Sequence, residues 1–252
     1  MSLRSTIDIL DSKIENCLID KDQRAYLYDP YFEIVRNRVN AEYCKGLIRL
    51  DRKEEVVKKI VNFLIDTQNE DGSWNEIHPY YDETSSLVTS IVGDALIEWY
   101  KRNKKDTVRE VLESAKNYVL SCEIQPGYFI KSRNYRQDHL NVDATCADFL
   151  SSYSACFSDH ETKRAAEDAV EHIRKHQFDN GVFPYRVGSE EGSSSMKVPC
   201  IHYQGVTIYY LMKALGNLGT GDSTWLRRGT EWLSGVQKVN GNFDWSKSSL
   251  MF

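Results

Sequence analysis

The amino-acid sequence predicts an all-helical protein built from repeated helix hairpins, and three observations support this fold class. Four segments share one order: an apolar helix end, a glutamine, a short polar turn, a glycine and then aromatic residues. The helix before each turn carries apolar residues at three- and four-residue steps, which predicts one buried face. The helix after each turn is apolar around most of its circumference, which predicts burial on several sides. Such alternation is what two concentric rings of helices require.

The four turns justify the repeat in detail. They are FLIDTQNEDGSW, YVLSCEIQPGYF, IRKHQFDNGVFPY and WLSGVQKVNGNFDW, with their glycines at Gly72, Gly127, Gly181 and Gly241. Successive glycines are separated by 55, 54 and 60 residues, and similarity at a near-constant period is the signature of a repeat architecture. We expect each glycine to adopt a left-handed or turn conformation that strains other residues.

The remaining elements follow from the same pattern. The strongly apolar helices are expected at Ser85–Trp99, Ala144–Cys156 and Gly205–Leu215, and two N-terminal helices near Ser5–Leu18 and Tyr31–Ile48. A chain of 252 residues can bury one large core. We therefore predict a single domain over residues 1–252, with N-terminal helices in 1–50 and helix-hairpin repeats in 51–245.

Composition excludes several classes of function. The net charge is −5, and the basic residues are scattered among acidic ones, which argues against a nucleic-acid-binding surface. No apolar run approaches the roughly 20 residues of a membrane span, and the N-terminus lacks the apolar core of a signal peptide. The sequence therefore predicts a cytoplasmic protein that binds no nucleic acid and has no transmembrane segment.

The first turn carries a resemblance to a known superfamily. QNEDGSW, Gln68 to Trp74, resembles the Gln-Trp repeat of squalene and oxidosqualene cyclases, whose superfamily includes the protein prenyltransferase β subunits. This resemblance implies an α/α toroid, an incomplete or small barrel of four helix hairpins plus N-terminal helices. Family barrels usually close with five or six hairpins. Either the ring is open here, or a missing segment, a second copy in a homodimer or another partner chain completes it.

Candidate site residues lie between each turn and the apolar helix that follows it, where the rim of a central cavity is expected. Histidine, tyrosine, arginine and carboxylates gather there, which suits proton transfer on a polar substrate. The predicted catalytic residues are His202, Tyr203, Asp143 and His139. The predicted substrate-binding residues are Trp74, Tyr80, Tyr81, Arg133, Arg136, Tyr185, Arg186 and Gln204.

The leading hypothesis is carbohydrate processing. CIHYQGVTIYYL, Cys200 to Leu211, resembles a helix start found in toroid proteins of polysaccharide biosynthesis, although His202 and Tyr203 stand in swapped order. Guanidinium groups pair bidentately with carboxylates, so the three arginines suit an anionic sugar. In this hypothesis His202 and Tyr203 act as base and acid on a uronate, as in lyases and epimerases, and Asp143 and His139 assist.

Two alternatives involve prenyl chemistry. NVDATC, Asn141 to Cys146, resembles the DxDDTA motif of class II terpenoid cyclases, which implies Asp143 as the acid that protonates an alkene. Asn141 and Ala144 replace the flanking acids of that motif. Protein prenyltransferases bind zinc through Asp, Cys and a later His. The resemblance implies Asp143, Cys146 and His202 as zinc ligands, with an Asp-to-Cys spacing of three residues instead of two. Otherwise no cofactor is expected.

Non-catalytic interpretations complete the set. A four-hairpin array can present aromatic residues to a glycan or peptide as a binding module, because fold alone does not imply catalysis. Asp82 and Asp143 precede apolar helices, where an acid commonly caps free backbone N–H groups. Trp74 is a candidate for packing between hairpins, and His202 for a hydrogen-bonded helix residue.

Overall fold

The computed structural model describes residues 3–187, 200–220 and 223–248. The chain divides into two compact units, residues 1–115 and 116–252, and each is considered by itself. The boundary falls within helix α5, Asp106–Ser121. The predicted single domain over 1–252 therefore stays a prediction.

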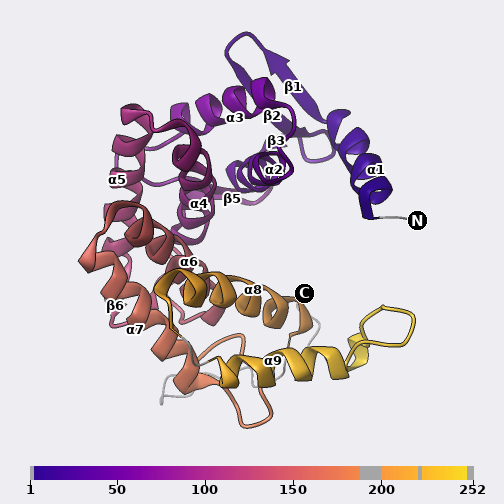
Figure 1. Ribbon diagram of the computed structural model, residues 1–252, viewed down its shortest axis with the longest axis vertical. Helices are drawn as coiled ribbons and strands as arrows, with labels where there is room; N and C mark the ends of the chain where they lie inside the picture. Colours follow the sequence, from indigo (N-terminus) through magenta and orange to yellow (C-terminus); the bar gives the residue numbers. More distant parts are fainter. Residues whose placement is uncertain (1–2, 188–199, 221–222, 249–252) are drawn as a thin grey trace. The chain divides into compact units, whose positions relative to one another are not determined.

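Unit 1 contains helices that contact one another through α2, Asn37–Leu50. This helix packs on both α3, Glu54–Asp66, and α4, Ser86–Asn103 (Figure 1). The N-terminal helix α1, Leu3–Glu15, lies where the sequence predicts a helix. The second predicted N-terminal helix begins later than expected, at Asn37 instead of near Tyr31.

The preceding residues form strands that the helical prediction missed. Strands β1, β2 and β3 cover Leu18–Lys21, Arg24–Asp29 and Ile34–Val35 and make an antiparallel sheet in that order. The hairpin of β1 and β2 lies on α3, where Lys59 pairs with Asp20 at 2.6 Å. Alternate side chains of β2 are buried, and such two-residue alternation indicates a strand.

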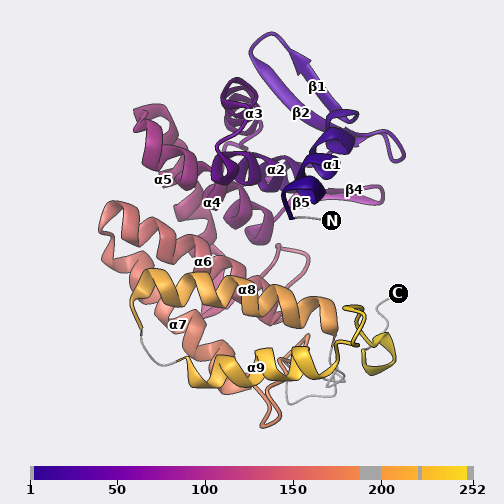
Figure 2. The ribbon, with the colours of Figure 1, turned by 45° about the vertical axis from the view of Figure 1, so that its right-hand side comes forward.

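Unit 2 is built around α6, Leu140–Phe157, which packs against α7, His160–His176, and α8, Ile201–Leu218. Helix α9, Thr224–Gly235, packs on α8. Figures 1 and 2 both show α6 and α8 side by side. A short 3₁₀ helix, Trp245–Lys247, follows the fourth turn.

The alternation of helix types agrees with the sequence prediction, with one exception. Helix α4 is buried on every side from Ser86 to Ile97, and α6 is buried from Leu140 to Tyr153. Helices α3, α5, α7 and α9 each bury a single face. Helix α8 differs, because Tyr209 and Met212 on one side of it are exposed.

The turn glycines have the conformation that the sequence predicts, and three of them also touch the next amphipathic helix. All four have positive φ angles, between 77° and 88°. A Cβ placed on Gly72, Gly127 or Gly181 would lie 2.3 Å from a helix carbonyl oxygen, that of Ser114, Asp168 or Arg228 respectively. A Cβ on Gly241 would meet no atom of the described residues within 4 Å. The first three turns therefore require glycine for packing as well as for conformation.

A glutamine four residues before the glycine holds the turn to the next helix. The Gln68 side-chain amide donates hydrogen bonds to the carbonyls of Gly72 and Val111, at 3.0 and 2.9 Å. Gln177 donates in the same way to Gly181 and Trp225, both at 3.0 Å. In the second repeat the matching residue is Glu123, which accepts from the Gly127 N–H at 2.8 Å.

Replacing Glu123 with glutamine should raise stability by about 1 kcal/mol near neutral pH, the net value of one added hydrogen bond. Burial raises the pKa of Glu123, and the nearby Asp168 carboxylate adds to this effect. The folded state then holds a proton more tightly than the unfolded chain, so the stability linked to Glu123 is lost as pH rises through its folded pKa. The gain of E123Q should thus be smallest below the usual glutamate pKa, about 4.3, and should grow as pH rises. Urea denaturation across this range measures it, and a gain confined to acidic pH would contradict the argument.

Buried ion pairs join the strongly buried helices at matching positions. Asp94 of α4 pairs with Lys45 of α2 at 3.2 Å, and Asp148 of α6 pairs with Lys213 of α8 at 2.5 Å. Both aspartates lie at the same distance from the start of their helix. Removing one partner of a buried pair leaves the other charge uncompensated, so these pairs fix how neighbouring helices align.

A helix that spans a membrane must be both long and apolar. Within residues 3–187, 200–220 and 223–248, none of the helices combines the length and apolar character needed to cross a bilayer.

Candidate functional site

Five rings in unit 2 form a continuous series of contacts. The ring centroids of Tyr135 and His139 are 5.2 Å apart, those of His139 and Tyr185 are 4.6 Å apart, and those of Tyr185 and Tyr203 are 4.4 Å apart. His202 packs edge-on against Tyr203 at 5.1 Å. We call this group, together with Arg186, the aromatic cluster: Tyr135, His139, Tyr185, Arg186, His202 and Tyr203.

Two helix starts and one loop position the aromatic cluster. His139 precedes the first residue of α6, and His202 and Tyr203 lie in the first turn of α8. Tyr185 and Arg186 follow the third glycine turn. Gln204 holds this segment, since its Oε1 accepts from the Phe183 N–H at 2.8 Å and its Nε2 donates to the Gly181 carbonyl at 3.1 Å. Gln204 is buried, so it supports the site instead of binding substrate as predicted.

Arg186 brings a positive charge with unused donors into the aromatic cluster. Its Nη2 donates to the Tyr135 hydroxyl at 3.0 Å. Its Nε is buried and makes no hydrogen bond to any described residue, and no described carboxylate pairs with the guanidinium. Arginine stays charged in proteins, so Arg186 can form an ion pair with an anionic group of a ligand.

His139 is almost fully buried within the aromatic cluster. Burial, followed by the positive charges of Arg186 and Lys131, lowers the pKa of His139 to about 4. Its imidazole is therefore neutral at physiological pH. Burial also raises the pKa of the Tyr185 phenol, and the neighbouring Tyr203 adds to this effect. Tyr185 is therefore a proton-bearing group at neutral pH.

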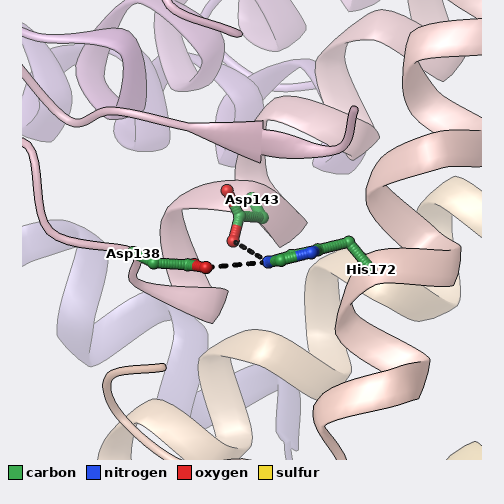
Figure 3. A group of neighbouring side chains, drawn as sticks. All are labelled: Asp138, Asp143 and His172. Atoms are coloured by element: carbon green, nitrogen blue, oxygen red, sulfur yellow. Dashed lines mark hydrogen bonds and ion pairs between the residues drawn. The ribbon is translucent and has the colours of Figure 1, made fainter. Parts of the chain in front are cut away.

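A second group of side chains includes Asp138, the residue directly before His139 in the sequence. It consists of Asp138, Asp143 and His172, shown in Figure 3. We call it the Asp–His group. The His172 Nε2 is 2.9 Å from Oδ2 of Asp138 and 4.0 Å from Oδ2 of Asp143. Oδ1 of Asp143 accepts the Phe129 N–H at 2.8 Å. The group thus connects a loop, the start of α6, the β6–β7 hairpin (Glu123–Gln125 and Tyr128–Phe129) and α7.

The electrostatics of the Asp–His group follow from burial and from two close carboxyls. Burial raises the pKa of Asp143 well above its usual value, and the Asp138 charge acts in the same direction, while the Phe129 N–H opposes it. Two carboxylates this close are costly to ionise together. Burial, together with both aspartates, also raises the pKa of Tyr128 to about 12.

The structure brings together part of the predicted site. His139, Tyr185, Arg186, His202 and Tyr203 all belong to the aromatic cluster. Asp143 does not, since it is fully buried in the Asp–His group. It also does not cap α6: His139 holds the cap position, and Asp143 lies in the first turn.

Two predicted arginines remain outside the cluster. Arg133 and Arg136 are exposed in the loop before α6, and within the described residues no ion pair involves either. The carbonyl of Arg136 accepts a hydrogen bond from the Tyr128 hydroxyl.

Three predicted binding residues lie in unit 1. Trp74 is completely buried, and its Nε1 donates to the Leu64 carbonyl at 2.8 Å, so it packs the first repeat instead of stacking on a ligand. Tyr80 and Tyr81 lie at the exposed tip of a hairpin formed by β4, Asn75–His78, and β5, Tyr81–Thr84. Asp82 lies within β5 and does not cap α4, whose N-cap is Ser85.

The predicted zinc ligands do not assemble. Cys146 is completely buried within α6 and His202 is exposed on α8. Over the described ranges, the residues whose ligand atoms gather around Asp143 are Asp138 and His172.

Sequence reasoning missed His172 because it lies on α7, whose charged residues suggest a solvated helix. One sequence signal could have indicated His172: it stands four residues before His176, so both histidines lie on the same face of a helix. In the structure their ring centroids lie 4.5 Å apart. Tyr135 and Asp138 lay in the predicted rim, but nothing in the sequence separated them from their neighbours.

The fold is similar to those of several glycan-acting proteins of known structure. An α-mannanase of family GH76 from Bacteroides thetaiotaomicron matches with a TM-score of 0.73 at 7% identity, over 96% of this chain and 71% of that one. A polysaccharide lyase matches with a TM-score of 0.61 at 12% identity, over 89% and 68%. An unsaturated glucuronyl hydrolase from Bacillus sp., responsible for glycosaminoglycan degradation, matches with a TM-score of 0.61 at 11% identity, over 80% and 62%.

These likenesses establish the fold and nothing finer. No protein-family model and no curated protein sequence matches the chain. The three structures confirm the predicted α/α-toroid class. Their names describe proteins that act on glycans, which agrees with the predicted resemblance to toroid proteins of polysaccharide biosynthesis. None of the three is a terpenoid cyclase or a prenyltransferase. The chain spans about two thirds of their lengths, from 62% to 71%.

Proposed function

We propose that this protein is an enzyme that acts on a carbohydrate bearing a carboxylate, and that it removes the proton beside that carboxylate. The observation that carries this proposal is Arg186, a guanidinium with unused donors among tyrosine and histidine rings. Aromatic faces bind the apolar faces of sugar rings, and guanidinium groups pair bidentately with carboxylates. The glycan-acting proteins that share the fold support the substrate class.

Each residue of the aromatic cluster has a proposed role. Arg186 pairs with the uronate carboxylate and stabilises the negative charge that develops when the adjacent carbon loses its proton. Tyr135 and Tyr185 contact the sugar ring. His202, which is exposed, accepts the proton, and Tyr203 donates one to the leaving oxygen or to the opposite face of the carbon. The first outcome is lyase chemistry and the second is epimerisation. The buried His139 positions Tyr135 and Tyr185.

The other hypotheses receive less support. Terpenoid cyclisation needs Asp143 facing a cavity, but this side chain is buried against Phe129 and His172. Zinc-dependent prenyl transfer needs Cys146 and His202 beside Asp143. A non-catalytic glycan-binding module uses the same Arg186 and tyrosines without proton transfer, and turnover distinguishes it from an enzyme.

The experiment compares acidic and neutral glycans in D₂O. Oligosaccharides of galacturonate, mannuronate, guluronate and glucuronate are incubated with the protein, beside α-1,6-linked mannan. We expect deuterium at the carbon next to the carboxylate, or an unsaturated uronate, with at least one acidic glycan. Binding of acidic glycans without exchange would make the protein a binding module. Turnover of mannan alone would overturn the uronate proposal.

A further inference from the structure

The Asp–His group contains a buried acceptor that the protein leaves without a hydrogen bond. Asp143 is completely buried, and its Oδ2 has no hydrogen-bond donor among the described residues. Oδ1 of Asp138 is also buried and without a donor. A buried polar atom without a hydrogen-bond partner destabilises the folded state, and a bound ligand can remove that cost. Figure 3 shows Oδ2 of Asp143 directed at the point where Asp138 and His172 meet.

The three side chains have the geometry of a coordination site. One ligand atom from each lies within 4.8 Å of the other two. Around a cation with bonds of about 2.0–2.2 Å, neighbouring ligand atoms lie roughly 3.0–3.5 Å apart. The separations from His172 Nε2, 2.9 and 4.0 Å, bracket that range. A cation therefore fits between the three side chains after small side-chain adjustments.

The charges also favour a cation. Within the described part of the chain, the ion pairs of Asp138 and Asp143 are made by His172 alone. Two carboxylates and one imidazole are ligands that bind first-row divalent metals. A divalent ion would neutralise both carboxylates without requiring either to hold a proton.

We propose that Asp138, Asp143 and His172 bind one divalent transition-metal ion, Zn²⁺ in the first instance. Three protein ligands leave at least one position open. Two of the three ligands retain some exposure, Asp138 at 11% and His172 at 16%, so solvent can reach the group. The ion would connect the loop that carries Tyr135 and His139 to α6 and α7, and so hold the base of the aromatic cluster. This inference does not rest on the proposed function, because metal binding is measured without a glycan.

The ligand set gives a direct test. Tag-free protein purified without chelators is analysed for metal by mass spectrometry, and metal-free protein is titrated with Zn²⁺, Mn²⁺ and Co²⁺. We expect about one Zn²⁺ per chain, and a melting temperature raised by roughly 5–10 °C at a hundred times the dissociation constant. The Co²⁺ complex should lack a thiolate charge-transfer band, which separates this site from one that contains Cys146.

Matched variants make the test specific. Asp143→Asn and His172→Gln should each lose at least tenfold in Zn²⁺ affinity. His176→Gln, on the same helix and in ring contact with His172, should bind as the wild type does. Absence of stoichiometric binding by the wild type, or equal binding by all variants, would overturn the proposal. If Asp143→Asn fails to fold, the wild-type titration and His172→Gln still decide the question.

Discussion

Alanine at Gly181 should destabilise the protein by about 2–5 kcal/mol, the combined cost of a strained backbone and of overpacking. Gly181 has a φ of 88°, and its added Cβ would lie 2.3 Å from the Arg228 carbonyl oxygen. Left-handed backbone costs a side chain about 1–2 kcal/mol, and overpacking adds about 1–3 kcal/mol. The carbonyl belongs to helix backbone and cannot rotate away, so α9 itself must move.

Gly241 provides the matched control for this prediction. It occupies the same position of the next repeat with a φ of 85°, but its hypothetical Cβ would contact none of the residues that the structure describes. G241A should therefore cost about 1–2 kcal/mol, the conformational part alone. The two variants should therefore differ by the overpacking cost alone, about 1–3 kcal/mol, which for a chain of this length is roughly 2–12 °C in melting temperature. Equal melting temperatures would show that backbone contact with the following helix contributes nothing.

Replacing Arg186 with glutamine should lower kcat/KM on an acidic glycan about 100-fold. Hydrogen bonds to a charged group contribute about 1.5–3 kcal/mol, and each 1.36 kcal/mol corresponds to a factor of ten in rate. Most of the loss should appear on acidic substrates, because a neutral sugar offers no carboxylate to the guanidinium. Steady-state kinetics on matched acidic and neutral oligosaccharides measure the difference.

Two further variants separate the contributions of surface charge and of the planar guanidinium group. Arg133 lies in the same unit but is exposed on a loop, so R133Q should stay within about twofold of the wild type, as expected for rim charges. R186K keeps the charge but loses the planar fork, and it should have intermediate activity. Similar losses in R186Q and R133Q would mean that general surface charge, and not one carboxylate contact, governs activity.

The fold was predictable because its determinants are local. Positive φ at Gly72, Gly127, Gly181 and Gly241, and the amphipathic or strongly apolar character of each helix, follow from residues close together in sequence. The strands at residues 18–35 were missed because a single small sheet leaves only a short alternating pattern. The early start of α6, at Leu140, was missed because no side chain caps it.

The site was predictable only where it lies in the turns. Residues next to helix starts, such as His139 and Tyr203, follow from the repeat pattern. The partnership of Asp143 with His172 does not, because it depends on how α7 packs against α6. Likewise, nothing in the sequence distinguishes Arg186, which lies in the cluster, from Arg133, which is exposed. Tertiary packing alone makes that distinction.

The contact between a turn glycine and the next helix also has a consequence for folding. Within unit 2, Gly127 and Gly181 pack directly against the backbone of α7 and α9, which leaves no room for a Cβ at either glycine. Each of these hairpins therefore packs against the next helix along the chain. The stability of one hairpin is thus coupled to that of its nearest neighbour, as in a one-dimensional repeat array. The turn at Gly241 carries no such dependence among the described residues, since its glycine touches no following helix. Its conformation is therefore set by its own hairpin.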